Sequence, residues 1–120
     1  MKQENIILDK SFAFAVRVVK LYQHLCNEKK EYVLSKQLLR SGTSIGANIN
    51  EAQAGQSKND FIAKMSISSK EARETKYWID LLIATSYLNK DDKHTETLVS
   101  EIEEIIKMLI SIVKSSQENK

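Results

Sequence analysis

The stretch LVSEIEEIIKMLISIV (residues 98–113) carries the strongest structural signal in the chain. Large apolar residues recur in it at alternating spacings of four and three, which places them on one face of an α-helix. These residues are Leu98, Ile102, Ile105, Leu109 and Ile112. Glu101, Glu103 and Glu104 fall outside that face. The stretch therefore predicts an amphipathic helix over about residues 92–116, with an apolar face that must pack against other helices.

Three further segments show helical periodicity, and we expect helices over about residues 9–28, 33–54 and 58–88. Ser57 and either Asp91 or Asp92 are suited to begin helices as N-caps, and Gly55 is suited to end one. The chain of 120 residues has no proline and only three glycines, so it lacks the turn residues that sheets require. These features predict an all-α fold, with residues 1–120 forming a single antiparallel, up-down-up-down four-helix bundle.

The middle of the second predicted helix, Ser41–Ala47, consists mainly of small residues and includes two glycines. Each glycine is about 1 kcal/mol less favourable than alanine inside a helix. We interpret the segment as a site of close approach by another helix, and Ser68, Ala72 and Thr75 of the third helix as a matching small surface. A local break in the helix is the alternative interpretation.

The first predicted helix is apolar over roughly 220° of its circumference, more than one packed face requires. One set of apolar residues contains Phe12, Ala15, Val16, Val19, Tyr22 and Cys26. A second set contains Phe14, Val18, Leu21 and Leu25. Because an exposed apolar patch of this kind marks an interface, we predict that the second set lies in the subunit contact of a homo-oligomer.

Several functional classes find no support in the sequence. A lone cysteine, Cys26, a polar N-terminus and the absence of any long apolar run favour a cytoplasmic protein with no membrane partner. His24 and His94 lie far apart, and the chain contains neither Glu-x-x-His nor Gly-Lys-Ser/Thr. We therefore expect no catalytic residues, no metal and no cofactor, and we rank a small enzyme last among the hypotheses.

Charge is distributed unevenly along the chain, although its net charge is only +2. Residues 1–40 hold eight basic and four acidic residues, whereas residues 77–120 hold five basic and eight acidic residues. Clustered cations can bind phosphate backbones without a base-specific motif, so the first region contains candidate nucleic-acid contacts. These candidates are Lys10, Arg17, Lys20, Lys36 and Arg40. The alternative is an ordinary solvated face.

Four polar residues near the small-residue segments form a second candidate group: Asn48, Glu51, Glu71 and Arg73. Polar groups beside a packed interface are unfavourable unless they are paired. We predict that they form a structural polar cluster in which Asn48 and Glu51 hold the third helix near Arg73 and Lys76. A catalytic use of Asn48, Glu51 and Glu71 is the enzyme hypothesis ranked last above.

Three blocks of sequence resemble a known family. They are QLLRSGTSIGANINEA (residues 37–52), SKNDFI (residues 57–62) and SKEARETKYWIDLL (residues 69–82). These blocks are similar to the four-helix bundle family of the 23S rRNA intervening-sequence proteins. The resemblance implies a relation to the accessory variability protein of diversity-generating retroelements, a homopentameric barrel that binds nucleic acid and a reverse transcriptase.

The resemblance thus implies a ring-shaped homo-oligomer, by analogy a pentamer, with RNA or DNA and a protein such as a reverse transcriptase as partners. The chain departs from the family pattern at Gly46, where some relatives have proline, and in residues 52–56, which lack an arginine found in relatives. A nucleic-acid contact through that arginine is therefore not implied here. We expect a non-enzymatic homo-oligomeric scaffold or adaptor that binds RNA or DNA through a basic face. The alternative is a purely structural protein–protein interaction module without nucleic-acid affinity.

Overall fold

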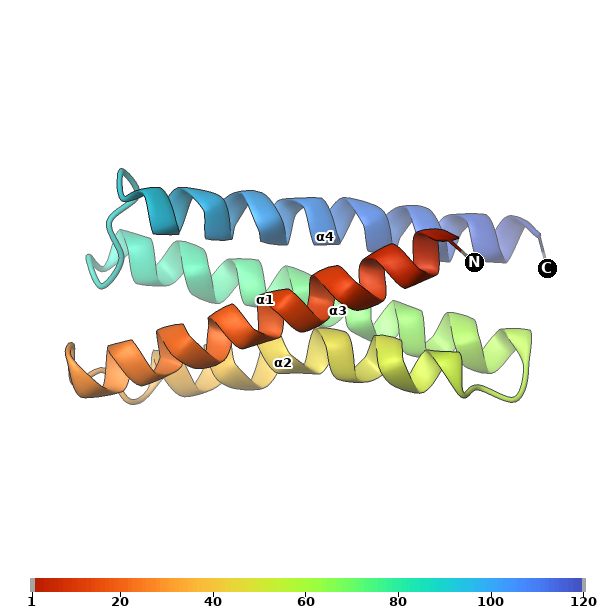
Figure 1. Ribbon diagram of the computed structural model, residues 1–120, viewed down its shortest axis with the longest axis horizontal. Coiled ribbons are helices and arrows are strands. Elements are labelled where there is room, and N and C mark those ends of the chain that lie inside the picture. Colours follow the sequence, from red (N-terminus) through yellow and green to blue (C-terminus); the bar gives the residue numbers. More distant parts are fainter. Residues whose placement is uncertain (1, 120) are drawn as a thin grey trace.

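The computed structural model describes residues 2–119, and within that range it contains four helices and no strand. These are α1 (Lys2–Asn27), α2 (Leu34–Gln53), α3 (Lys58–Ala84) and α4 (Lys93–Glu118). In Figure 1 the chain reverses direction at each connector, so α1 begins at the end of the molecule where α4 ends. The molecule measures 46 × 22 × 19 Å. The prediction of an all-α fold with four helices is confirmed.

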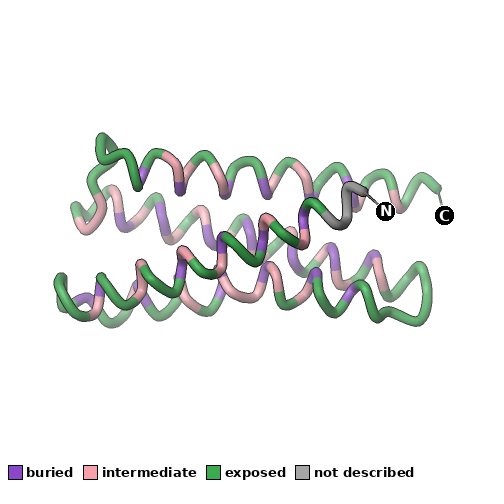
Figure 2. The backbone as a smooth tube through the Cα atoms, in the orientation of Figure 1, coloured by how far each residue is buried: buried purple, intermediate pink, exposed green. Residues whose placement is uncertain are grey.

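Each helix packs against two neighbours, because α2 lies between α1 and α3, and α4 contacts both α3 and α1. The α2–α3 contact is the most extensive and the α1–α4 contact is the least extensive. One core runs along the molecule, and Figure 2 shows its buried residues as a stripe on the inner side of each helix. α4 contributes the five apolar residues predicted from its spacing, Leu98, Ile102, Ile105, Leu109 and Ile112.

The buried face of α1 differs from the prediction. Phe14, Val18 and Leu25 are fully buried in the core of the single chain, and Leu21 is half-buried against it. The prediction that these four residues form a subunit interface is therefore wrong, since Phe14, Val18 and Leu25 are covered by the chain's own helices and only Leu21 keeps part of its surface exposed. The helix also begins seven residues earlier than predicted, because Ile7 extends the same buried stripe by one heptad.

The small-residue segment of α2 is continuous helix, so the alternative of a local break is wrong. A Cβ atom added to Gly42 would lie 2.8 Å from both Cγ1 and Cγ2 of Val18 on α1. On the other side, the Thr75 hydroxyl donates to Ser41 Oγ at 3.0 Å, and Ser68 Oγ donates to the Ile45 carbonyl at 2.8 Å. Small residues therefore let α2 approach α1 through glycine and α3 through serine and threonine.

The helix ends follow the predictions in part. Ser57 caps α3 by accepting a hydrogen bond from the Asp60 amide at 3.1 Å, and Asp92 caps α4 by accepting one from the His94 amide at 3.1 Å. The C-cap of α2 is Ala54 rather than Gly55. α3 ends at Ala84, four residues earlier than predicted, since Ser86 adopts a positive φ of 69° and turns the chain out of the helix.

A capping residue that the sequence analysis did not single out is Glu31, in the α1–α2 connector. Its carboxylate is buried and accepts hydrogen bonds from the amides of Val33 at 3.1 Å, Leu34 at 3.0 Å and Ser35 at 2.7 Å. Burial alone would raise the pKa of Glu31, but the amide donors outweigh it and hold the pKa below its usual value. Glu31 thus replaces a side-chain N-cap at the start of α2, where Val33 provides none.

Candidate functional site

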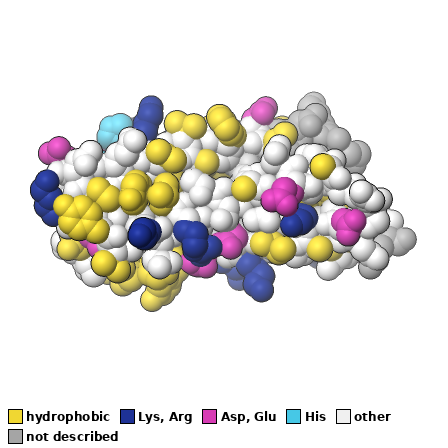
Figure 3. Space-filling model, turned by 90° about the horizontal axis from the view of Figure 1, so that it is seen from below, with side chains coloured by type: hydrophobic (Ala, Val, Ile, Leu, Met, Phe, Trp, Pro, Cys, Tyr) yellow, Lys and Arg dark blue, Asp and Glu magenta, His cyan; other side chains and the backbone are white. Residues whose placement is uncertain are grey.

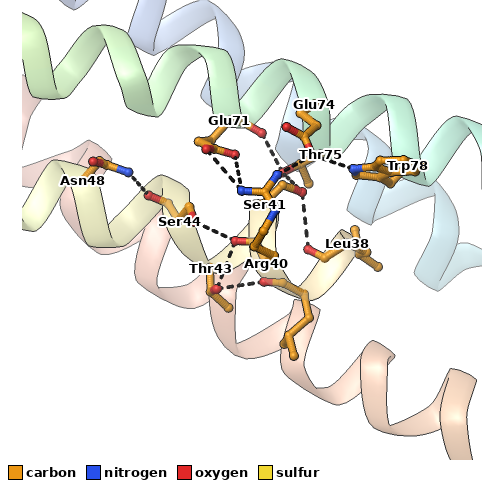
Figure 4. A network of polar contacts seen from close by, with 11 residues as sticks. Leu38, Arg40, Ser41, Thr43, Ser44, Asn48, Glu71, Glu74, Thr75 and Trp78 are labelled. Carbon is orange, nitrogen blue, oxygen red and sulfur yellow. Dashed lines mark hydrogen bonds and ion pairs between the residues drawn. The ribbon is translucent and has the colours of Figure 1, made fainter. Parts of the chain in front are cut away.

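The sequence blocks at residues 37–52 and 69–82 lie opposite each other on α2 and α3 and are joined by a polar network (Figure 4). Arg40 of α2 reaches across to α3, where Nη1 lies 3.3 Å from Glu71 Oε1 and Nη2 contacts Glu74. The indole nitrogen of Trp78 donates to Glu74 Oε2 at 2.9 Å. We call Arg40, Glu71, Glu74 and Trp78 the Arg40 network.

The chemistry of the Arg40 network is that of a fixed ion pair. The hydrogen bond from Trp78, and then that from Arg40, hold the pKa of Glu74 below its usual value. The two carboxylates raise the pKa of Arg40 further above neutral pH. A carboxylate whose charge is stabilised in this way is a poor general base near pH 7. The network therefore orients α2 against α3 and holds Trp78 edge-on to Tyr77, with ring centroids 5.1 Å apart.

The predicted polar cluster does not assemble. Asn48 donates to the Ser44 carbonyl of its own helix at 2.8 Å, and Glu51 pairs with Lys64 at 3.2 Å on the surface. Glu71 joins Arg40 instead, while Arg73 is exposed. The prediction that Asn48 and Glu51 approach Arg73 and Lys76 is wrong, because Glu51 lies nearer the end of α2, beside the first turns of α3.

The predicted basic face is largely neutralised within the chain. Lys10 pairs with Glu104 at 2.7 Å, and Arg17 pairs with Glu101 at 2.8 Å while also donating to the His94 carbonyl. Arg40 is held by the network described above. Of the five predicted cations, Lys20 and Lys36 are exposed and have no ion pair among the described residues. The acidic partners lie on α4 and α3, far from these cations in sequence, so the ion pairs could not be predicted from residues 1–40 alone.

The apolar residues of α1 that remain outside the core belong to the other set identified from the sequence. Phe12 is 71% exposed, Val16 is 40% exposed and Val19 is 37% exposed. We call these three residues the α1 strip. Beside it, α1 and α2 form a groove of about 550 Å³ that includes Phe12, Ala15, Gly46 and Ala47. Figure 3 views the molecule from the side of α2 and shows hydrophobic side chains gathered at the end where α1 finishes and α2 begins.

A cationic surface that the sequence analysis missed lies between α3 and α4. Lys70 and Arg73 of α3 and Lys114 of α4 have no ion pair among the described residues. They line two adjoining grooves between these helices, together with Tyr77, which is 60% exposed, and Ile110. We call this surface the α3–α4 groove. The spacing of Lys70, Arg73 and Tyr77 at i, i+3 and i+7 was the signal available in the sequence.

Other kinds of site find no support in residues 2–119. Among residues 6–119, whose side chains the structure describes, no three histidine, cysteine or carboxylate side chains lie close enough together to hold a metal ion. None of the four helices is both long enough and apolar enough to cross a membrane.

The fold and these surfaces define an all-α protein built on a close α1–α2 contact, with exposed apolar and cationic faces. The chain belongs to the family of 23S rRNA-intervening sequence proteins, whose sequence pattern matches residues 3–111. The family resemblance predicted from three short blocks is thus confirmed over most of the chain.

The chain is closely similar to a solved structure. That structure is the crystal structure of a protein of unknown function from the S23 ribosomal protein family of Bacteroides thetaiotaomicron VPI-5482. The two proteins are 54% identical, the match covers 93% of this chain and 98% of the other, and the TM-score is 0.89. No curated protein matches the chain significantly.

Proposed function

We propose that this protein is a non-enzymatic scaffold that associates with copies of itself through the α1 strip. The observation that carries the proposal is the exposure of Phe12 in the middle of a long helix, with Val16 and Val19 continuing the same strip. Burying a large apolar side chain at a contact contributes up to roughly 1.5–3 kcal/mol. Three such residues can offset part of the free energy lost when two molecules associate.

The groove beside the α1 strip supports the same proposal. Gly46 and Ala47 leave room next to Phe12, so a neighbouring subunit can insert side chains between α1 and α2. The resemblance to the accessory variability protein, a homopentameric barrel, favours a closed ring, and by analogy a pentamer, in which every subunit uses the same two surfaces. The interface then differs from the one predicted from the sequence, although it lies on the same helix.

Light scattering on the purified chain tests this proposal. We expect the wild type to be an oligomer, and Val16→Glu combined with Phe12→Lys to be a folded monomer. Ile110→Glu is the matched control, since Ile110 of α4 is 41% exposed, close to the 40% of Val16, and lines the α3–α4 groove rather than the α1 strip. A monomeric wild type, or an intact oligomer in the double variant, would contradict the proposed interface.

A second function, contact with single-stranded RNA or DNA, is favoured by the α3–α4 groove. Lys70, Arg73 and Lys114 can follow a phosphate backbone, and the exposed ring of Tyr77 can stack on a base. The groove carries this hypothesis better than the predicted basic face, where Lys10, Arg17 and Arg40 are paired with carboxylates.

Fluorescence anisotropy with a labelled 15-nucleotide single strand tests this second function. The log of the association constant should fall linearly with log[salt], and we expect the magnitude of this negative slope to decrease by about 0.7 for each cation removed, and thus by about 1.4 for Lys70→Gln with Arg73→Gln. Lys10→Gln is the control, because its charge is already paired with Glu104. If the wild type shows no salt-dependent binding, the alternative of a purely structural interaction module is the better description.

A further inference from the structure

A pocket that none of these functions uses lies between α1 and α4. It has a volume of about 380 Å³ and is located where the α3–α4 connector enters α4. Leu21 of α1, Leu88 of the connector and Leu98 of α4 provide its apolar lining. Polar side chains from both helices complete the wall, so the pocket combines an apolar surface with polar groups in the manner of small-molecule sites.

The side chain of Thr95 is the most informative polar group in this pocket. Thr95 is only 4% exposed, and its hydroxyl takes part in none of the side-chain hydrogen bonds found among the described residues. Among the described residues, every side-chain oxygen that is fully shielded from solvent has a hydrogen-bond partner. The Thr95 hydroxyl must therefore be reached from the pocket that it lines, where it is available to a ligand.

The charges around the pocket restrict the kind of ligand. Arg17 is occupied by Glu101, by the His94 carbonyl and by the Thr97 hydroxyl. Asp92 caps α4 and remains a negative charge on the wall. Lys20 is exposed and has no ion pair among the described residues, so it is the one lysine or arginine of the wall that is not already paired, and the imidazoles of His24 and His94 lie beside it on the same wall.

We propose that this pocket binds a small monocarboxylic acid with an apolar body. The carboxylate lies against the Lys20 ammonium group and the Thr95 hydroxyl, while the apolar body covers Leu21, Leu88 and Leu98. A single negative charge matches Lys20, the one lysine or arginine of the wall without an ion pair, whereas Asp92 repels a phosphate dianion more strongly than a monoanion. Because the pocket shares no residue with the α1 strip or the α3–α4 groove, this inference is independent of the proposed function.

Titration of the ¹⁵N-labelled protein with octanoate, followed by NMR, tests the proposal, with 1-octanol and inorganic phosphate as comparison probes. We expect octanoate to shift the amide signals of residues 17–24 and 92–98. The alcohol should shift the same signals with an affinity about tenfold weaker, since it lacks the charge that pairs with Lys20. Phosphate alone should cause no saturable shift. Equal affinity for octanoate and 1-octanol, or shifts centred elsewhere, would overturn the assignment.

Two variants test where the carboxylate group of octanoate binds. Lys20→Met should weaken octanoate binding about tenfold and leave 1-octanol binding unchanged, because only the charged contact is lost. Thr95→Val keeps the shape of the side chain and should also weaken octanoate binding selectively. Lys36→Met is the matched control, since Lys36 is an exposed lysine of α2 outside the pocket. Unaltered octanoate affinity in Lys20→Met would overturn the proposal.

Discussion

The spacing between α1 and α2 should depend on the absence of a side chain at residue 42. In Gly42→Ala the new Cβ would lie 2.8 Å from both methyl groups of Val18 and 3.3 Å from its Cβ. Rotation of the buried, β-branched Val18 cannot move all three atoms away, so the helices must separate. At Gly46 the nearest atom, Ser11 Oγ, is 3.3 Å from the added Cβ, a contact that a small adjustment relieves.

The two glycines form a matched pair, because either alanine raises helix propensity by about 1 kcal/mol. The difference between their free energies of unfolding therefore measures the cost of overpacking at Gly42, and we expect Gly42→Ala to be less stable than Gly46→Ala by about 1–3 kcal/mol. Urea denaturation followed by circular dichroism measures both free energies of unfolding, and the m-values should agree with that of the wild type. Adding Val18→Ala to Gly42→Ala should recover about 1 kcal/mol or more as a coupling energy. Equal stability of Gly42→Ala and Gly46→Ala would refute the reasoning.

Further predictions concern the polar groups. Glu31→Ala should destabilise the protein by about 1–3 kcal/mol, because three amides at the start of α2 lose their acceptor. Folding lowers the pKa of Glu31, so its stabilising effect is complete above the pKa that Glu31 has in the unfolded chain and is lost as pH falls through the lower pKa of the folded protein. Between about pH 5 and pH 2, the melting temperature of Glu31→Gln should therefore fall less than that of the wild type. Trp78→Phe removes the donor to Glu74 and should raise the pKa of that carboxyl toward its usual value, as measured by NMR titration. Glu51→Ala should change the free energy of unfolding by less than about 0.5 kcal/mol, since its pair with Lys64 is exposed, and a larger loss would show a second role for Glu51.

Local spacing was sufficient to predict the features that depend on one helix at a time. The apolar face of α4 and the caps at Ser57 and Asp92 follow from residues within one or two turns of each other. The close approach at Ser41–Ala47 was also predictable, because glycine and serine are unfavourable inside a helix unless a neighbour needs the space.

The face that α1 buries was not predictable in this way. The helix is apolar on two sides, and its register is decided by the contact between Val18 and Gly42, two residues on different helices. The same limit applies to charge, because the sequence alone does not show that Glu101 of α4 forms an ion pair with Arg17 and so neutralises a predicted phosphate contact. Properties that depend on which helices become neighbours need the fold before they can be assigned.

The limited packing between α1 and α4 has a consequence for motion. Exposed or half-exposed ion pairs such as Lys10–Glu104 and Arg17–Glu101 contribute at most about 1 kcal/mol each, and salt weakens them. Separation of α1 from α4 should therefore need less free energy than separation of α2 from α3. Amide hydrogens along the α4 side of α1 would then exchange with solvent through openings that leave α2 and α3 paired, and faster at high ionic strength. A ligand held between α1 and α4 would slow that exchange by closing the contact that opens most easily.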